Sequence, residues 1–267
     1  MNYYDLSVLA DEIESCMRCG NCQATCPYYQ ETGSESSVAR GRIALAKYVL
    51  QGKLKYTPVL AERFECLTCY ACNAACPCGV PIDRIFLAAR AAMVREGGAP
   101  FLKKLMATAL KNQGLLDLGF KTAARAKGLF FKPHSSGGLT PRFPLGLDLR
   151  RVFPPLSPQT FRDGMKEAMT VPGAKGNVAF FTGCLANYVY PSTGRAVVEV
   201  LNKCGVSVLI PGEQHCCGAP LAINGIMETA EQMARSHVDL FSGLEVDAVV
   251  VACGTCGESF KQKYVNL

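Results

Sequence analysis

The hydrophobic positions in the first hundred residues recur with the period of an α-helix. Between residues 38 and 50 they come every three or four positions, with serines before the run as caps and Gly52 after it as a stop. A second run with this spacing occupies residues 82–93 and ends before Gly97 and Gly98. We predict two amphipathic helices, whose apolar faces are Ile43, Leu45, Ala46, Val49 and Leu50, and Ile82, Ile85, Phe86, Ala89 and Met93.

From about residue 175 the pattern changes to short runs rich in β-formers. Residues 177–181, 206–210 and 247–251 are such runs, and helical stretches of about 191–204 and 225–241 separate them. Alternating strands and helices predict parallel strands in an α/β layer. Each run leads into a segment that contains cysteine, and the carboxyl ends of parallel strands meet at one edge of a sheet. The pattern therefore predicts a group of cysteines at that edge.

Net positive charge is concentrated in the segment between the two patterns, residues 97–174. From Arg95 to Arg151 there are eleven Lys and Arg and three Asp and Glu, an excess larger than the net charge of +6. Residues 101–111 predict a basic amphipathic helix, whereas the later part has too many Pro and Gly for regular structure. The positive charge would be explained if this segment docks on anionic lipid or on an acidic partner. It would be explained equally if its helices cover the neighbouring domain and are basic on their outer face. No nucleic-acid recognition motif accompanies the charge.

The composition is that of a globular chain, with 267 residues, 49% of them hydrophobic and 19% charged, and its length predicts two domains. No run is long and apolar enough to span a bilayer, so we expect any membrane contact to be peripheral. Residues 1–11 contain no basic segment leading into an apolar run, so no export signal is expected. We predict a cytoplasmic protein, either free or peripheral on the cytoplasmic face of the inner membrane.

Eight of the fifteen cysteines repeat one motif at an offset of fifty positions. The motif Cys-x2-Cys-x2-Cys-x3-Cys-Pro begins at Cys16 and again at Cys66. This is the spacing of proteins with two [4Fe-4S] clusters, in which three thiolates of one turn bind one cluster and the fourth binds the other. The predicted ligand sets are Cys16, Cys19, Cys22 and Cys76 for the first cluster, and Cys66, Cys69, Cys72 and Cys26 for the second.

Zinc, disulfides and buried apolar cysteines are the alternatives at these positions. Zinc sites usually have paired Cys-x2-Cys arms and do not need a repeated third and fourth cysteine followed by proline. Disulfide scaffolds are short secreted chains, unlike this one. Arg40 and Arg42 lie near the start of the first predicted helix, and we expect them on a solvated helix face rather than beside a cluster or a partner's carboxylate.

Five further cysteines follow the predicted strands as Cys-x31-Cys-Cys-Gly and a later Cys-x2-Cys. Helix amino-termini point to the same sheet edge, and their partial positive charge favours thiolates. Buried structural cysteines would explain one or two of these positions but hardly five, so we predict a metal site. Its candidate ligands are Cys184, Cys216, Cys217, Cys253 and Cys256.

The two remaining cysteines are not predicted as ligands. We expect Cys78 to be a buried neighbour of a cluster and Cys204 to lie in the core. His215 adjoins Cys216, but a plain loop histidine explains it better than a bond to a cluster sulfur or a metal. His134 and His237 carry still less information.

The two cysteine motifs and the helices that join and flank them resemble the α-helical ferredoxin fold. The Cys-Cys-Gly element resembles the cysteine-rich domain of the heterodisulfide reductase and succinate:quinone reductase families. The resemblance implies an α+β multidomain protein: an α-helical ferredoxin domain with two [4Fe-4S] clusters (1–96), the basic connector (97–174) and an α/β cysteine-rich Cys-Cys-Gly domain (175–267). In those families the Cys-Cys-Gly cysteines help to hold an iron-sulfur centre, which is non-cubane in some members, or a different metal. A third centre of open type is therefore implied here.

Over nearly its whole length the chain resembles the iron-sulfur subunits of glycolate oxidase and of FAD-linked lactate dehydrogenases. Both cysteine motifs, the helix that begins Arg40-Gly-Arg-Ile and the proline-rich residues 154–161 carry this resemblance. The cysteine motifs are shared with the D-type subunit of heterodisulfide reductase and with the C-type subunit of anaerobic glycerol-3-phosphate dehydrogenase. Members of the family generally continue into a second Cys-Cys-Gly domain, and no second copy precedes Leu267.

The resemblance implies a non-catalytic electron-transfer subunit. FAD on a partner subunit would oxidise a 2-hydroxy acid such as glycolate or lactate. The clusters would pass the electrons to a quinone, an electron-transferring flavoprotein or another iron-sulfur protein. The chain itself has no Gly-x-Gly-x-x-Gly after a strand and no nucleophile elbow. There are three alternatives: heterodisulfide reductase-like thiol and disulfide chemistry at the Cys-Cys-Gly centre, a relay like that of the C-type subunit of anaerobic glycerol-3-phosphate dehydrogenase, and a purely structural role for the clusters.

Overall fold

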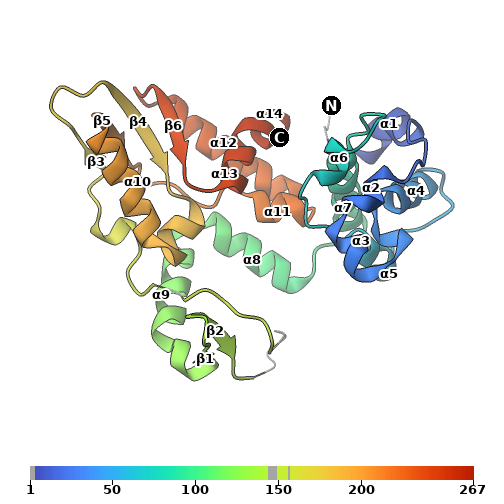
Figure 1. Ribbon diagram of the computed structural model, residues 1–267, viewed down its shortest axis with the longest axis horizontal. Coiled ribbons are helices and arrows are strands. Elements are labelled where there is room, and N and C mark those ends of the chain that lie inside the picture. The colour runs from blue at the N-terminus through green and yellow to red at the C-terminus, as the bar shows by residue number, and fades with distance from the viewer. Residues whose placement is uncertain (1–3, 144–148, 156) are drawn as a thin grey trace. The chain divides into compact units, whose positions relative to one another are not determined.

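The computed structural model describes residues 4–143, 149–155 and 157–267 and divides the chain into two compact units (Figure 1). The first unit comprises Met1–Lys104, Pro220–Ala230 and Asn266–Leu267, and the second comprises Leu105–Ala219 and Glu231–Val265. Residues 144–148 and Leu156 of the predicted connector lie outside the described residues. The inclusion of Pro220–Ala230 in the first unit has no counterpart in the sequence prediction.

The first unit contains helices and no strand among its described residues. The predicted helices over 38–50 and 82–93 are confirmed as α4 and α7. The elements up to α7 are the 3-10 turns Leu6–Leu9 and Glu35–Ser37, with α1 Ala10–Glu14, α2 Asn21–Ala24, α3 Pro27–Thr32, α4 Ala39–Leu50, α5 Pro58–Arg63, α6 Ala71–Ala74 and α7 Ile82–Gly97.

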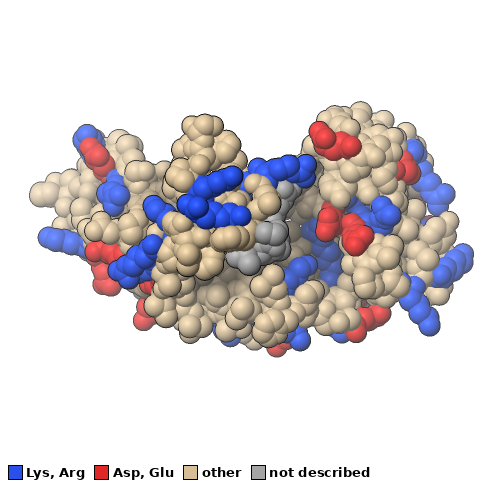
Figure 2. Space-filling view, turned by 90° about the horizontal axis from the view of Figure 1, so that it is seen from below, with Lys and Arg blue, Asp and Glu red and all other residues tan. Residues whose placement is uncertain are grey.

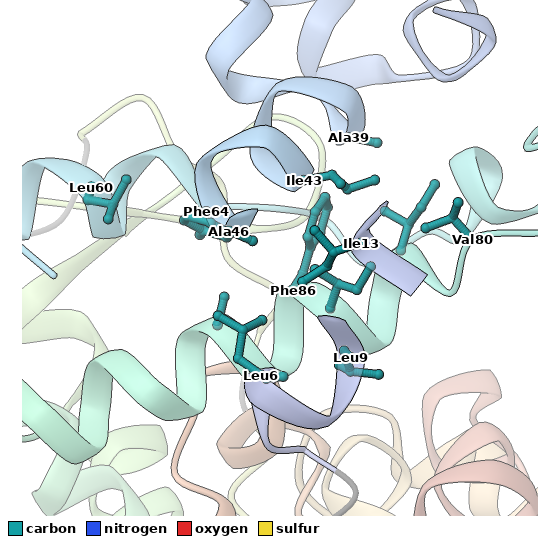
Figure 3. Packing of buried hydrophobic residues seen from close by; sticks show 14 residues of the cluster. Leu6, Leu9, Ile13, Ala39, Ile43, Ala46, Leu60, Phe64, Val80 and Phe86 are labelled. Carbon is teal, nitrogen blue, oxygen red and sulfur yellow. The ribbon is translucent and has the colours of Figure 1, made fainter. Parts of the chain in front are cut away.

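Helices α4 and α7 bury their apolar faces in the core of the first unit (Figure 3). Ile43 of α4 and Phe86 of α7 meet there, and the Phe64 ring packs edge-on against Phe86 with its centroid 6.2 Å away. Several partly buried cysteines pack against this core, namely Cys16, Cys22, Cys66, Cys72 and Cys76. The burial of apolar area that stabilises this unit therefore also fixes the cysteine loops.

The connector is more regular than its composition predicts. The helix expected over residues 101–111 is confirmed as α8 (Phe101–Lys111), but a second helix, α9 (Gln113–Phe130), follows it. The antiparallel pair β1 (Phe131–Pro133) and β2 (Leu139–Pro141) comes next, so the expectation of no regular structure is wrong there. Lys and Arg side chains are interspersed with acidic and uncharged residues on the face in Figure 2. No helix of the described residues could cross a membrane.

The second unit is built on a four-stranded sheet with the order β3-β5-β4-β6. Strand β4 pairs in parallel with both β5 and β6, which confirms the predicted parallel layer, and β3 adds an antiparallel edge. The strands are β3 Ala168–Met169, β4 Gly176–Phe181, β5 Val206–Leu209 and β6 Ala248–Val251.

Helices cover both faces of this sheet. Because successive side chains of a strand point to opposite sides, neighbouring residues of β4 contact different helices. Phe180 packs with Val198 of α10, whereas the Phe181 ring lies 5.1 Å from the His237 ring of α12. The remaining elements of this half of the chain are the 3-10 turn Arg162–Gly164, the π-helical turns Leu185–Val189 and Ser259–Lys263, and α10 Pro191–Lys203, α11 Ala219–Ile223, α12 Met227–Ser242, α13 Gly254–Glu258 and α14 Tyr264–Asn266. The carboxyl ends of β4, β5 and β6 lead into the cysteine segments.

Candidate iron-sulfur sites

The two cysteine loops of the first unit have the same backbone conformation at positions fifty apart. Arg18 and Thr68 both have positive φ, at 60° and 51°, and so do Gly20 and Tyr70, at 89° and 62°. The short helices α2 and α6 begin directly after Gly20 and Tyr70. A left-handed conformation costs a non-glycine residue about 1 kcal/mol or more, and such strain gathers at functional sites. The repeat in the sequence is therefore a repeat in structure.

The first cavity between the loops is lined by one cysteine set of the sequence prediction. Cys16, Cys19 and Cys22 come from the first loop, and Cys76 comes from the end of the second motif. Cys19 is exposed and the other three are half-buried. The described structure thus brings together the four thiols that were predicted to share a cluster.

The second cavity repeats this arrangement with the motifs exchanged. Cys66, Cys69 and Cys72 come from the second loop, and Cys26 comes from the end of the first motif. The backbone N–H of Thr68 donates to the Cys66 sulfur at 3.3 Å, and Cys69 is the exposed member of the set. Each motif therefore contributes three thiols to one cavity and one thiol to the other.

The thiols of both cavities have the chemistry expected of cluster ligands. Burial raises the pKa of the Cys72 thiol to about 12 and also raises the pKa of Cys22. A desolvated thiolate is costly unless nearby cations neutralise it, and iron ions do so. No His, Cys, Asp and Glu side chains of the described residues converge in the manner of a site for one metal ion. Four thiols around a cavity fit a polynuclear cluster better than a single zinc ion.

Each cavity is also lined by one arginine of α4. Arg40 lies at the first cavity, where its Nη1 donates to the Arg18 carbonyl at 3.1 Å. Arg42 lies at the second cavity and only 1% of it is exposed, so the prediction of a solvated face is wrong for this residue. The error arose because helical periodicity does not reveal that a charged side chain has buried backbone partners.

Five cysteines of the second unit gather at the carboxyl edge of its sheet, as predicted. Cys184 follows β4, Cys216 and Cys217 follow β5, and Cys253 and Cys256 follow β6. Their side chains form a continuous series of thiol contacts, from Cys184 through Cys216, Cys217 and Cys256 to Cys253. Cys216, Cys217 and Cys256 are buried.

Hydrogen bonds within this series separate its thiols into donors and acceptors. The thiols of Cys216 and Cys256 donate to Cys217 and hold the pKa of Cys217 far below its usual value. The contacts of Cys216 with the Cys184 and Cys217 sulfurs raise the pKa of Cys216, and the contact with Cys217 raises that of Cys256. A buried sulfur whose pKa is lowered in this way is one that a nearby cation would stabilise as thiolate.

Glycines allow these cysteines to approach one another. Gly183, before Cys184, has φ +61°, and a Cβ there would lie 3.1 Å from the Cys256 sulfur. Gly218, after Cys217, has φ +80°. The Cys-Cys-Gly sequence therefore combines two adjacent ligand candidates with a residue that can adopt the left-handed turn.

A buried hydrogen-bond chain behind this site was missed by the sequence prediction. The backbone N–H of His215 donates to Nε2 of His237 at 3.4 Å, and the other ring nitrogen of His237 lies 3.0 Å from the Tyr264 hydroxyl. That hydroxyl donates to the Cys217 carbonyl at 3.0 Å. Because Nε2 accepts, Nδ1 carries the proton. The chain thus holds the backbone on both sides of the Cys216–Cys217 pair, and His237, fully buried, had given no signal in the sequence.

The two cysteines outside the three sets are both exposed. The expectations of a buried Cys78 and a core Cys204 are therefore wrong. Cys78 nevertheless lines the first cavity, next to Cys76.

The comparisons with known proteins agree with this division into sites. A model of the 4Fe-4S dicluster domain matches residues 12–80, and a model of the cysteine-rich domain matches residues 178–261. The probable glycolate oxidase iron-sulfur subunit of Bacillus subtilis is 31% identical over 96% of this chain and 60% of its own length. The chain thus contains a 4Fe-4S dicluster domain and a cysteine-rich domain, and over nearly its whole length it is similar to the glycolate oxidase iron-sulfur subunits. No solved structure gives a significant match.

The relatives that this chain resembles are named for different activities. The glycolate oxidase iron-sulfur subunit of Escherichia coli is 27% identical over 95% of this chain and 59% of its own length. The D-type subunit of the dihydromethanophenazine:CoB–CoM heterodisulfide reductase of Methanosarcina barkeri is 25% identical over 96% of this chain and 58% of its own length. The chain thus spans about 60% of the length of these curated relatives.

Proposed function

We propose that this chain is the electron-transfer iron-sulfur subunit of a complex that oxidises a 2-hydroxy acid. Electrons would come from an FAD-containing glycolate or lactate dehydrogenase subunit and leave to a quinone, an electron-transferring flavoprotein or another iron-sulfur protein. The observation that carries the proposal is the pair of cavities in the first unit, each lined by four cysteines from both motifs. The family relationship supports a role within a multi-subunit oxidoreductase.

Two [4Fe-4S] clusters would be held in these cavities. The proposed ligands are Cys16, Cys19, Cys22 and Cys76 for the first and Cys26, Cys66, Cys69 and Cys72 for the second. Such clusters, when bound, accept and release single electrons. The chain's contribution is to fix the thiolates on rigid loops, to supply N–H donors such as that of Thr68, and to limit access of water by the packed core.

A third centre is proposed at the Cys-Cys-Gly site, with the ligands Cys184, Cys216, Cys217, Cys253 and Cys256. The series of thiol contacts at the carboxyl edge of the sheet supports it. We place the complex in the cytoplasm or on the cytoplasmic face of the inner membrane, because the proposed partners and free thiols suit a reducing compartment.

The test is the visible absorbance of the anaerobically purified native complex, challenged in turn with D-lactate, L-lactate, glycolate and glycerol 3-phosphate. Bleaching of the cluster bands by one hydroxy acid supports the relay and identifies the donor. Bleaching by glycerol 3-phosphate alone would assign the chain to a relay of the glycerol-3-phosphate dehydrogenase type. If a flavin is bound and none of these substrates bleaches the bands, the proposal fails.

The second candidate function is thiol or disulfide chemistry at the Cys-Cys-Gly site. The lowered pKa of Cys217, caused by donation from Cys216 and Cys256, favours it because the thiolate is the reactive form. The burial of Cys216 and Cys217 favours a bound centre instead. Bleaching by a dithiol and by no hydroxy acid, in a complex without flavin, would select this second function.

A further inference from the structure

Two arginines bind the backbone of the segment that leads into the second cysteine loop. Nε of Arg42 donates to the Arg63 carbonyl at 2.6 Å, and its Nη2 donates to the Glu65 carbonyl. Nε and Nη2 of Arg90 donate to the Phe64 carbonyl at 3.0 and 2.6 Å, and its Nη2 lies 3.4 Å from the Cys66 carbonyl. The two guanidinium groups thus share four consecutive carbonyls, which end at a proposed cluster ligand.

Arg42 is buried and Arg90 is half-buried, and neither has a carboxylate bound to it among the described residues. Arg42 is 1% exposed and lies between the Tyr28 and Phe86 rings, 5.2 and 5.3 Å from their centroids. Arg90 donates its remaining Nη1 to the Ile223 carbonyl at 2.8 Å. A buried charge with only carbonyl partners is expensive unless an anion lies nearby.

The anion that suits this environment is a cluster in the second cavity. Arg42 lines that cavity together with Cys66, Cys69, Cys72 and Cys26. The cavity also contains the carboxylate of Asp83, which the Asn73 side chain hydrogen-bonds. Arg42 balances this carboxylate, and Arg90, which binds the Phe64 and Cys66 carbonyls of the same loop, adds a second cation. Glu65 near Arg90 is exposed, where water and salt screen its charge.

The first cavity has a different electrostatic environment. Its Arg40 is paired with Glu35, with Nε to Oε1 at 2.6 Å and Nη2 to Oε2 at 3.0 Å, and about a third of the Arg40 side chain is exposed. Arg18, also at this cavity, is exposed. An exposed or neutralised cation contributes little to the potential inside a cavity.

We propose that Arg42 and Arg90 are positioning residues that hold the Cys66 loop and make the second cavity the site of higher reduction potential. This inference rests on the proposed function, since it requires a cluster in each cavity. A single electron that enters the pair then resides at the cluster of Cys26, Cys66, Cys69 and Cys72. Adding it changes that cluster from [4Fe-4S]²⁺ to [4Fe-4S]⁺, and the nearby positive charge favours the reduced, more negative form.

The experiment is an anaerobic EPR-monitored titration of the full chain, with dithionite as the one-electron donor. Cys19→Ser and Cys69→Ser variants assign each signal to a cavity. Arg42→Gln removes the charge, Arg42→Lys keeps it but breaks the shared carbonyl contacts, and the double variant Glu35→Gln with Arg40→Gln removes the first cavity's ion pair without changing net charge.

We expect the second cavity to be reduced first in the wild type. Arg42→Gln should shift its one-electron equilibrium at least tenfold toward the oxidised form, about 59 mV. Arg42→Lys should shift it less than threefold, and the double variant should leave the second cavity unchanged. Earlier reduction of the first cavity, or equal shifts for Arg42→Gln and Arg42→Lys, would overturn the proposal.

The proposal can still be tested if the Arg42 variants lose iron from the second cavity. If the Arg42 variants do not load the second cavity, the same comparison is made with Arg90→Gln and Arg90→Lys. If those variants also fail to load, the order of reduction in the wild type tests the proposal. Reduction of the second cavity first supports it, and reduction of the first cavity first overturns it. Absence of both signals from the wild type would instead contradict the proposed function, so the two failures are distinguishable.

Discussion

Gly20 shows at the scale of one residue how the first cysteine loop depends on its neighbours. Its φ of +89° is left-handed, and an added Cβ would lie 3.0 Å from Nη1 of Arg40 and 3.2 Å from Oε1 of Gln23. We expect Gly20→Ala to lose about 1–2 kcal/mol through backbone strain and to displace Arg40 from the cavity. Iron bound at the first cavity should fall, as measured by iron analysis and EPR of the purified chain.

Gly52→Ala is the matched control for this substitution. Gly52 also has positive φ, at +68°, but no atom lies within 4 Å of the position that a Cβ would take there. The Gly52→Ala variant should therefore have similar backbone strain but keep its full iron content. Full iron content in Gly20→Ala would show that the loop adapts to a side chain, as the second loop does at Tyr70.

His237 predicts a pH dependence of folding stability. Burial, and after it the charge of the neighbouring His215, lower the pKa of His237 to about 3. In the unfolded chain the value is near 6.5, so below that pH the unfolded state binds a proton that the folded state does not. The contribution of neutral His237 is complete above pH 6.5 and is lost as pH falls toward 3. At pH 5 the loss is about 2 kcal/mol.

Urea unfolding of the chain, followed by circular dichroism at pH 7 and pH 5, measures this effect. His237→Gln should lose less stability than the wild type over this interval, because it cannot titrate. His134→Gln, at an exposed histidine, should behave like the wild type. An identical decrease in His237→Gln and the wild type would exclude His237 as the group responsible.

At the scale of elements, the sequence predicted what local periodicity encodes. The apolar faces gave α4 and α7, and the β-rich runs gave β4, β5 and β6 with their parallel order. Helix α9 was not predicted, because its glycines and lysines interrupt the pattern. The packing of Pro220–Ala230 in the first unit also had no local signal. It depends on a close approach, since a Cβ on Gly225 would lie 2.4 Å from the Arg90 carbonyl oxygen.

Gly41 tests whether close packing outweighs helix propensity in α4. Replacing glycine by alanine within a helix gains about 1 kcal/mol from propensity. A Cβ on Gly41, however, would lie 2.0 Å from the Glu35 carbonyl oxygen, a backbone atom that cannot move without shifting the preceding 3-10 turn. We expect Gly41→Ala to destabilise the chain by about 1–3 kcal/mol in thermal or urea unfolding.

Gly128→Ala provides the opposite case in α9. No atom lies within 4 Å of a Cβ at Gly128, so propensity alone should act and stabilise the chain by up to about 1 kcal/mol. If Gly41→Ala were also stabilising, the approach of α4 to the turn Glu35–Ser37 would not constrain the fold. The Arg40-Gly-Arg sequence would then need another explanation.

At the scale of the whole molecule, the cysteine motifs predicted more of the site than of its surroundings. Spacing alone suggested which thiols share a cavity, and the structure brings those thiols together. Spacing did not reveal Arg42, Arg90, His237 or Tyr264, because their roles depend on backbone carbonyls that are distant in sequence. Ligand candidates are therefore readable from a motif, whereas the groups that orient and tune them emerge only from the fold.

The exchange of the fourth cysteine between motifs gives the last prediction. Cys26 lines the cavity of the second loop, and Cys76 lines that of the first. If these contacts become ligand bonds, Cys26→Ser should change the EPR signal assigned to the second loop and leave the first unchanged. Cys76→Ser should do the reverse. Cys78→Ser, at an exposed thiol beside Cys76, should change neither signal. A change in the signal of the serine's own motif would mean that each loop binds its cluster alone, and the two motifs would then be independent units rather than one interlocked pair.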